Sequence, residues 1–303
     1  MLGWMISGED MQELFIYRLN TGSCNGCDIE VVGALAERFR LGNAGVKVVG
    51  EPENANVLIV TGVVTSKMKE HLKQVYEKIK PPKIVVAAGS CALSSGVFQG
   101  SYNIPNLVDE VIPVNGYVPG CPPSPHAIAG AIADIARAKL PDWHVPEDLR
   151  GVPEVDDEKC VGCAACVEAC PAGAIDIVDE SDKRTVRFSH AKCIFCARCE
   201  EVCPEDAIKM ATRYNIAAKD KGEMMDEAKL ELAKCTNCGA LFVPSKQLQK
   251  ISERILEDIG KYREFRGAIE KSMGICQNCR TLLENIKTAK SLLFSLNDAV
   301  REY

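Results

Sequence analysis

Residues 14–140 alternate between short apolar runs and longer segments in which apolar residues recur at helical spacing. Two of the runs, Val57–Val60 and Ile84–Ala88, are continuously apolar, which is typical of strands buried on both faces. Alternating strands and helices predict a parallel sheet with right-handed crossovers and helices on both of its faces. The predicted strands are Leu14–Leu19, Val46–Val49, Val57–Thr61, Ile84–Ala88 and Val111–Val114. The predicted helices are about Asp28–Arg40, Ser66–Lys80 and Ser124–Leu140.

The rest of the chain shows different patterns. The stretch Pro141–Pro153 holds three prolines and several charges and is typical of a linker. Residues 154–212 contain an internal repeat with an offset of 33 positions, and from about Met225 the sequence is predicted to be helical, with periodic stretches near Lys246–Lys271 and Thr281–Tyr303. We therefore expect three domains. They are a flavodoxin-like, doubly wound α/β domain over residues 1–150, a duplicated α+β unit over 151–215 and a helical segment over 216–303.

Composition restricts the class of protein. The 303 residues carry 36 Lys and Arg against 42 Asp and Glu, a net charge of −6, so the chain lacks the basic excess of nucleic-acid-binding proteins. A hydrophobic content of 47% with 26% charged residues is that of a folded globular protein. No apolar run reaches the length of about 18 residues that a membrane span needs, and no signal peptide is recognisable. We expect a cytoplasmic protein that does not itself cross the membrane.

The chain has 16 cysteines, and their spacing indicates chemistry. In a reducing cytosol, clustered cysteines point to metal ligation or thiol chemistry and not to disulfides. Eight of them form two runs of Cys-x2-Cys-x2-Cys-x3-Cys-Pro. This spacing is typical of two-cluster iron–sulfur proteins, in which the last cysteine of each run ligates the other cluster. One [4Fe–4S] cluster is therefore assigned Cys160, Cys163, Cys166 and Cys203, and the other Cys193, Cys196, Cys199 and Cys170.

Two zinc sites are the alternative for these eight cysteines. Zinc sites usually pair two Cys-x2-4-Cys halves and do not use three evenly stepped cysteines followed by Cys-Pro. The duplicated segment instead resembles bacterial two-[4Fe–4S] ferredoxins over about 55 residues.

Four further cysteines, Cys24, Cys27, Cys91 and Cys121, are scattered over the α/β domain. Each follows a predicted strand at its carboxyl end, the edge at which open α/β sheets build their sites, so we expect all four to meet at one metal centre. A thioredoxin-like dithiol at Cys24 and Cys27 is the alternative, and it leaves the other two cysteines without a role. Asp28, in the first turn of the next helix, is expected to complement the helix dipole. A redox-coupled carboxylate is the alternative role of Asp28.

The sequences around these cysteines carry a closer resemblance. The runs Thr21–Glu30, Gly89–Leu93 and Pro119–Pro125 are similar to the small subunit of membrane-associated, energy-converting [NiFe] hydrogenases, a family related to the terminal-cluster subunit of respiratory complex I. The resemblance implies that Cys24, Cys27, Cys91 and Cys121 ligate the proximal [4Fe–4S] cluster, the one nearest the active site of a partner large subunit. In complex I the first two ligands are adjacent cysteines, whereas Asn25-Gly26 separates them here. This spacing favours the hydrogenase branch, with a sulfur-reducing relative of the same spacing as the alternative.

The last four cysteines form the pairs Cys235/Cys238 and Cys276/Cys279. Gly239, after the first pair, allows the left-handed turn of a metal-binding knuckle. The gap of 37 residues between the pairs exceeds the roughly 15 to 20 of a zinc ribbon, so a helix is expected between them. We expect structural Zn²⁺ at these four thiols, with a rubredoxin-like single iron or unligated thiols as alternatives.

These features predict an electron-relay chain with three [4Fe–4S] clusters and one further metal ion. The ferredoxin segment resembles the two-cluster subunit beside the small subunit in the same complexes, so the chain resembles a fusion of two relay subunits. The resemblance implies a relay subunit of an oxidoreductase complex that interconverts protons and H₂ and translocates ions through partner subunits. The implied partners are a [NiFe] large subunit, membrane-arm subunits on the cytoplasmic side of the membrane, and a donor such as ferredoxin or a dehydrogenase.

This chain itself is expected to contain no catalytic residue and to show no H₂ turnover when isolated. The alternatives are a relay subunit of a complex I-like or sulfur-reducing oxidoreductase, a stand-alone polyferredoxin or flavodoxin-type carrier, and a binding module built on the zinc element. The acidic charge balance argues against nucleic acid as a partner.

Overall fold

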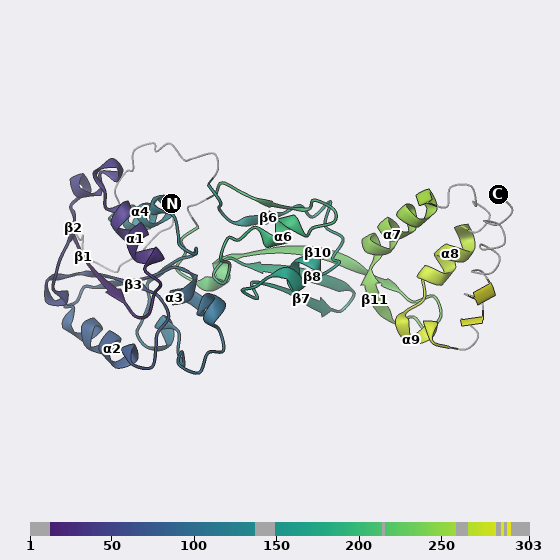
Figure 1. The fold of residues 1–303 in the computed structure, drawn as a ribbon, viewed down its shortest axis with the longest axis horizontal. Helices are drawn as coiled ribbons and strands as arrows, with labels where there is room; N and C mark the ends of the chain where they lie inside the picture. The colour runs from purple at the N-terminus through teal and green to yellow at the C-terminus, as the bar shows by residue number, and fades with distance from the viewer. Residues whose placement is uncertain are drawn as a thin grey trace.

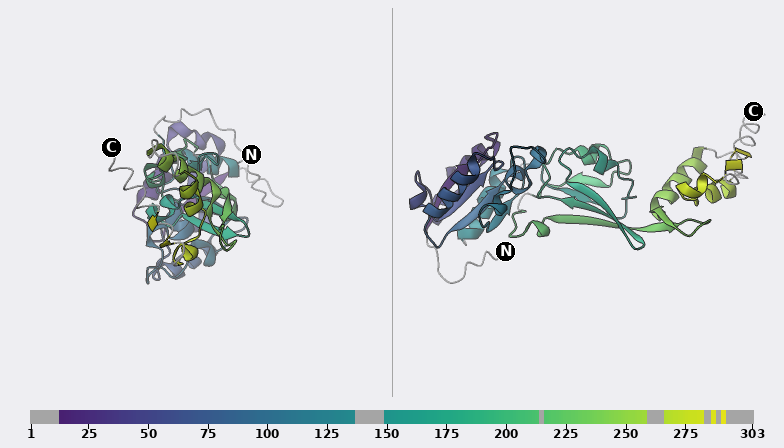
Figure 2. Two further views of the ribbon diagram at one scale, coloured as in Figure 1. Left: turned by 90° about the vertical axis from the view of Figure 1, so that its right-hand side faces the viewer. Right: turned by 90° about the horizontal axis from the view of Figure 1, so that it is seen from below.

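A computed structural model of the chain describes residues 13–136, 149–213, 216–258 and 266–282, together with four residues between 286 and 291. An α/β domain, a ferredoxin-like domain and a C-terminal helical part follow one another along the long axis of the molecule (Figures 1 and 2). Within the described residues, no helix combines the length and apolarity needed to cross a membrane.

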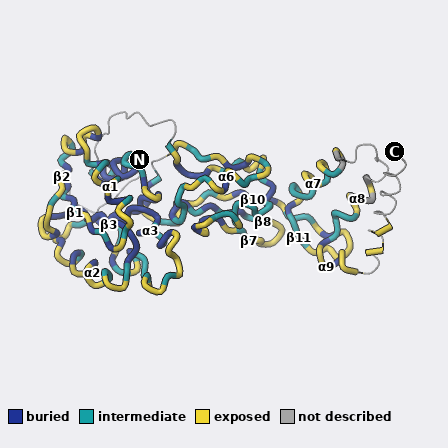
Figure 3. Tube along the Cα trace, in the orientation of Figure 1, coloured by how far each residue is buried: buried dark blue, intermediate teal, exposed yellow. Residues whose placement is uncertain are grey.

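Five parallel strands form the sheet of the α/β domain, in the order β2-β1-β3-β4-β5. The strands are β1 Leu14–Asn20, β2 Val46–Val48, β3 Val57–Thr61, β4 Ile84–Ala88 and β5 Gly116–Val118. This is the strand order of a flavodoxin-like, doubly wound sheet, so the predicted fold class is confirmed. Every residue of β3 and β4 is buried, as their continuous apolar runs predict. Buried residues are dark blue in Figure 3, where β3 is labelled.

Helices cover both faces of this sheet. The helices are α1 Gly26–Ala34, α2 Met68–Lys78, α3 Ser90–Ser94 and α4 Pro125–Ala136, with 3₁₀ turns at Glu37–Phe39, Leu41–Ala44, Pro52–Asn54, Gly96–Phe98 and Val108–Glu110. Residues of α1 and α4 share one apolar core with Ile16 and Ile59, and residues of α2 share the other with Leu58 and Val60. Successive strand residues point to opposite faces, which explains why neighbours such as Leu58 and Ile59 belong to different cores.

Two details of the α/β prediction are wrong, and one short helix is missing from it. The segment Val111–Val114 is not a strand, because its apolar side chains pack against the α2 face of the core while Gly116–Val118 pairs with β4. The predicted helix Asp28–Arg40 ends at Ala34, and Arg40 adopts a left-handed conformation with φ of 54°. Helix α3 is too short for its periodicity to be recognised. Most of the predicted linker lies outside the described residues, and its last residue, Pro153, begins the next strand.

The ferredoxin-like domain contains a four-stranded antiparallel sheet, a two-stranded sheet and two short helices. The large sheet has the order β11-β10-β8-β7 and the small one pairs β6 with β9. The elements are β6 Pro153–Val155, α5 Ala165–Ala169, β7 Ile175–Glu180, β8 Lys183–Ser189, α6 Arg198–Glu201, β9 Ile208–Met210, a 3₁₀ turn Lys221–Glu223, β10 Met225–Lys234 and β11 Leu241–Pro244.

Strand β10 corrects the expectation that the chain turns helical at about Met225. It pairs with β8 from Met225 opposite Ser189 to Glu231 opposite Lys183. Ala228 and Leu230 are buried between exposed neighbours, a period of two that belongs to a strand. A segment beyond the expected boundary at residue 215 is therefore part of the ferredoxin-like sheet.

The helices of the C-terminal part begin at Ser245. They are α7 Ser245–Asp258, α8 Arg266–Met273 and α9 Gln277–Arg280. The periodic stretch Lys246–Lys271 contains α7 and α8, whereas most of Thr281–Tyr303 lies outside the described residues.

Candidate iron–sulfur and metal centres

Loops at one edge of the α/β sheet bring Cys24, Cys27, Cys91 and Cys121 together. Cys24 lies between β1 and α1, and Cys27 lies in the first turn of α1. Cys91 lies in α3 after β4, and Cys121 follows β5. These segments all leave the carboxyl ends of parallel strands and therefore share one edge. Gly89 approaches Cys27 so closely that a side chain at position 89 would collide with the Cys27 sulfur. The four thiols, together the α/β site, also act on one another electrostatically.

Burial is the main cause of the raised pKa values of the thiols in the α/β site. It raises the pKa of Cys27 to about 12 and that of Cys91 to about 11, and neighbouring thiols add to both shifts. Burial also raises the pKa of Cys121. A reactive dithiol needs the opposite shift, since the thiolate is the nucleophile. Metal binding removes the thiol protons because thiolates are the ligands, so this set of four donors fits a [4Fe–4S] cluster better than a thioredoxin-like dithiol.

Asp28 anchors the loop that carries the first two cysteines. It is 5% exposed and lies in the first turn of α1, as the dipole interpretation requires. Its carboxylate also accepts hydrogen bonds from the side chains of Arg18, Asn20, Ser23 and Thr61. The carboxylate therefore ties β1, β3 and the cysteine loop together.

Each of two cavities in the ferredoxin-like domain is lined by four cysteines. The first cavity, the outer site, is lined by Cys160, Cys163, Cys166 and Cys203. The second cavity, the inner site, is lined by Cys170, Cys193, Cys196 and Cys199. Each takes three cysteines from one run and the fourth from the other run, which is the arrangement that the crossed cluster assignment requires.

The spread of the sulfurs distinguishes these two sites from zinc sites. Among the described residues, one group of three or more metal-ligating side chains has all its ligand atoms within 4.8 Å of one another. This group is the four cysteines of the C-terminal part. Thiolates that share one zinc ion must lie that close, because each Zn–S bond is about 2.3 Å long. The inner and outer sites therefore fit a larger, multi-iron group.

The internal repeat is also a repeat of backbone structure. Ala164 and Ala197 occupy equivalent positions and both adopt left-handed conformations, with φ of 70° and 65°. The sulfurs of Cys170 and Cys203 each accept a 3.2 Å hydrogen bond from the backbone N–H four residues later. Such N–H donors stabilise a thiolate, so both halves of the domain are shaped to hold charged ligands.

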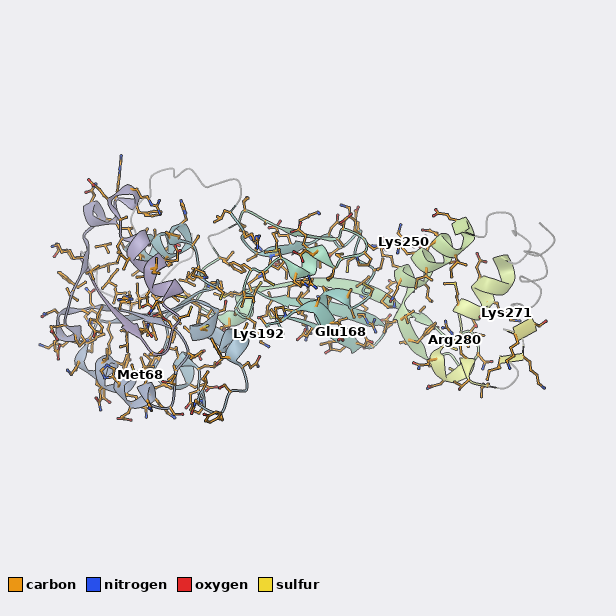
Figure 4. The ribbon with its side chains drawn as sticks, viewed as in Figure 1. Met68, Glu168, Lys192, Lys250, Lys271 and Arg280 are labelled. Carbon is orange, nitrogen blue, oxygen red and sulfur yellow. The ribbon has the colours of Figure 1, made fainter. Side chains whose placement is uncertain are left out.

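The inner site adjoins the α/β domain. Ser90 and Ser94 of α3 donate hydrogen bonds through their hydroxyls to the carbonyl oxygens of Cys193, at 2.6 Å, and Ala191, at 3.2 Å. Lys192, between these two carbonyls, lies at the junction of the domains (Figure 4). Ser90 precedes Cys91, so a single hydrogen bond joins the segments that carry the α/β site and the inner site.

The C-terminal site comprises Cys235 and Cys238 after β10 and Cys276 and Cys279 around α9. All four sulfurs lie within 4.8 Å of one another. Gly239 has a φ of 74°, and its N–H donates to the Cys235 carbonyl at 2.8 Å, as in a knuckle. The Cys276 N–H donates to the Cys235 sulfur at 3.3 Å and is the main cause that lowers the pKa of Cys235 to about 6. The gap between the pairs contains β11, α7 and α8, so the helix expected there is confirmed.

Comparison with known proteins identifies the α/β domain. Residues 24–135 match the family of the NADH ubiquinone oxidoreductase 20 kDa subunit. An uncharacterized protein of Methanocaldococcus jannaschii is 48% identical over 132 residues, which are 42% of this chain and 88% of that protein. The chain belongs to the 20 kDa subunit family. Residues 153–210 match the 4Fe-4S dicluster domain, so this member of the family carries a ferredoxin-type domain in the same polypeptide.

Two further similar proteins have names that indicate a function. The "probable membrane-bound hydrogenase subunit" of Pyrococcus furiosus is 43% identical over 136 residues, which are 44% of this chain and 81% of that protein. A chain in the solved structure of the membrane-bound sulfane sulfur reductase, an archaeal respiratory membrane complex, is 31% identical, with a TM-score of 0.37. The match covers 42% of this chain and 70% of that chain.

Sequence reasoning missed the residues that connect the sites. Ser90 and Ser94 lie about a hundred positions from their partners, with separations of 103 and 97, and no local pattern links them. One partner of Asp28 is also distant in the sequence, since Thr61 lies 33 positions away. The sequence shows that a polar side chain stands beside a ligand cysteine, but it does not show which residue that side chain contacts.

Proposed function

We propose that the chain is the non-catalytic electron-transfer subunit of an energy-converting [NiFe] hydrogenase complex and contains three [4Fe–4S] clusters. The ligands are the cysteines of the outer, inner and α/β sites. The observation that supports a continuous relay is the Ser90–Cys193 hydrogen bond of 2.6 Å, because it couples the segments beside two cluster sites. The similarity to the Pyrococcus furiosus hydrogenase subunit and the Cys24-x-x-Cys27 spacing support the hydrogenase assignment.

Contacts between the elements support an order of the three sites. A bound [4Fe–4S] cluster supplies a one-electron redox step. The residues of α3 hold the inner site next to the α/β site, and residues of α7 contact the loops of the outer site. The proposed relay therefore runs between an external donor at the outer site and a large subunit at the α/β site, with the inner site between them. Burial of Cys27 keeps water away from its own sulfur.

A partner surface next to the α/β site supports an exit there. Cys24 and Cys121 are exposed thiols. On α1, Ile29 and Val32 are 67% and 62% exposed, and residues three positions apart are neighbours on a helix surface. Adjacent exposed apolar side chains favour an interaction site. A large subunit that binds here would bury them together with the exposed ligands.

A second candidate function is a relay in a complex I-like oxidoreductase. The matched family, that of the NADH ubiquinone oxidoreductase 20 kDa subunit, supports it. The two candidates share the clusters and differ in the partner, because only the hydrogenase has a large subunit that binds nickel.

The complex purified through a tag on this chain tests the proposal. We expect it to contain nickel, to evolve H₂ from a reduced low-potential donor, and to exchange hydrogen isotopes between H₂ and water. Cys91→Ser should abolish donor-driven H₂ evolution and leave isotope exchange, which requires no electron relay. A complex without nickel that reduces a quinone would establish the second candidate instead. H₂ evolution by the isolated chain would overturn the non-catalytic role.

A further inference from the structure

The C-terminal site has the dimensions of a single-ion site. The sulfurs of Cys238 and Cys276 are 3.7 Å apart. Four thiolates at about 2.3 Å from one tetrahedral ion have sulfurs about 3.8 Å from each other, which agrees with this separation. A four-iron cluster is excluded here, because its ligands bind different irons and must stand further apart.

The character of the site favours zinc over iron. A tetrahedral set of four thiolates binds either metal, and a given site binds Zn²⁺ more tightly than Fe²⁺. Cys235, Cys276 and Cys279 are buried and pack against Phe242 and Ile275. Four protein ligands without an open position are the mark of a structural zinc site.

The site joins the segment that follows β10 to the segment around α9. Cys235 directly follows β10, so the first pair is continuous with the ferredoxin-like sheet. The backbone N–H of Thr236 donates to the Gly274 carbonyl at 2.9 Å, and this contact adjoins the second pair. Helix α7 lies in the chain between the two pairs, directly after β11, which pairs with β10. An ion bound by all four cysteines closes a loop that contains β11 and α7, and so adds to the contacts that hold this helix.

Helix α7 lies against the outer site. The Lys246 ammonium donates to the Asp157 carbonyl at 2.8 Å, and Asp157 is three residues before Cys160. The Arg254 guanidinium pairs with Glu205 at 2.5 Å, and Glu205 lines the outer cavity. Two basic side chains of one helix thus contact both loops that supply the ligands of the outer site.

The charge of Lys246 lies beside the outer site, because its ammonium bonds the loop that leads to Cys160. A positive charge close to a cluster stabilises the state that has gained an electron, since that state carries one more negative charge. Arg254 contributes less, because Glu205 neutralises it.

We propose that Cys235, Cys238, Cys276 and Cys279 bind one structural Zn²⁺, and that this ion holds α7 where Lys246 raises the reduction potential of the outer cluster. The second half of this inference rests on the proposed function, because it requires a cluster at the outer site. The zinc half does not.

Metal analysis of the purified full chain tests the first half. We expect one zinc per chain in addition to the cluster iron, and a Cys276→Ser/Cys279→Ser variant should lose the zinc and keep the iron. Iron at the C-terminal site, seen as one iron beyond the clusters with no zinc, would overturn the zinc assignment. One zinc per chain without cluster iron would overturn the proposed electron-transfer function and the effect of Lys246 on the outer cluster, but it would support the zinc assignment.

Potentiometric titration followed by electron paramagnetic resonance tests the second half. Lys246→Met should shift the midpoint of the outer cluster to a lower potential and leave the inner cluster unchanged. Lys271→Met is the matched control, because Lys271 lies on α8 away from the ferredoxin-like domain (Figure 4), and it should shift neither. The zinc-free variant should show the shift of Lys246→Met, and adding Lys246→Met to it should cause no further change.

An unchanged midpoint in Lys246→Met, or additive shifts in the combined variant, would overturn the tuning role. Lys246→Met retains the zinc site and the cysteines, so this test stands even if the zinc-free variant does not fold.

Discussion

Gly89→Ala is a sharp test of how the α/β site is built. Gly89 has a φ of 93° and a ψ of 147°, a region in which only glycine is at ease. An added methyl group would also collide with the Cys27 sulfur. The substitution therefore strains the backbone and displaces a proposed cluster ligand at the same time.

The two costs can be separated. The backbone strain amounts to about 1–3 kcal/mol, and forcing a methyl group into a filled space adds about 1–3 kcal/mol. Since a domain is stable by roughly 5–15 kcal/mol, we expect the chain to stay folded. Moving the Cys27 sulfur relieves the collision, so the cluster of the α/β site should be lost before the fold is. Gly100→Ala is the control, because Gly100 has a φ of 80° and nothing within 4 Å of an added methyl group.

Iron analysis with far-ultraviolet circular dichroism measures the outcome. Gly89→Ala should reduce the iron content from about twelve to about eight atoms per chain, following four irons per cluster. Gly100→Ala should keep the wild-type iron content, and both variants should keep their secondary structure. Full iron content in Gly89→Ala would refute the close approach of residue 89 to a cluster ligand.

Three further outcomes are expected. Asp28→Asn should lower the unfolding free energy of the α/β domain by roughly 1–2 kcal/mol, a value reduced because its ion-pair partner Arg18 is partly exposed; equal denaturation midpoints would contradict this. Ser90→Ala with Ser94→Ala should slow reduction of the α/β site after the inner site in freeze-quench spectra, while leaving the iron content unchanged; unaltered rates would contradict the role of this junction. Burial lowers the pKa of His190 in the folded chain, so the unfolded state binds more protons and stability falls as the pH drops below about 6.5. His190→Phe should flatten this decline in thermal unfolding, and an equally steep decline would contradict it.

The sequence allowed most of the sites to be predicted because ligand chemistry constrains spacing. The repeat predicts that Cys203 joins the cysteines of the first run and that Cys170 joins those of the second run. In the structure, each cavity is lined by these sets of four cysteines. The parallel sheet was predictable because strands buried on both faces, such as Ile84–Ala88, are continuously apolar.

Elements that depend on distant partners were not predictable. Strand β10 alternates buried Ala228 and Leu230 with charged residues, and its charges resemble those of an exposed helix. Its place is decided by β8, which lies some 40 positions earlier. The contact of Lys246 with Asp157 spans 89 positions and likewise has no local signal.

We propose that cysteines far apart in the sequence hold a third cluster beside the two of the ferredoxin-like domain. Mössbauer spectroscopy of the purified full chain and of its Cys27→Ala/Cys91→Ala variant counts these clusters. We expect about twelve cluster irons in the wild type and about eight in the variant, with the lost third belonging to one [4Fe–4S] species. Identical spectra and iron contents in the two proteins would contradict it.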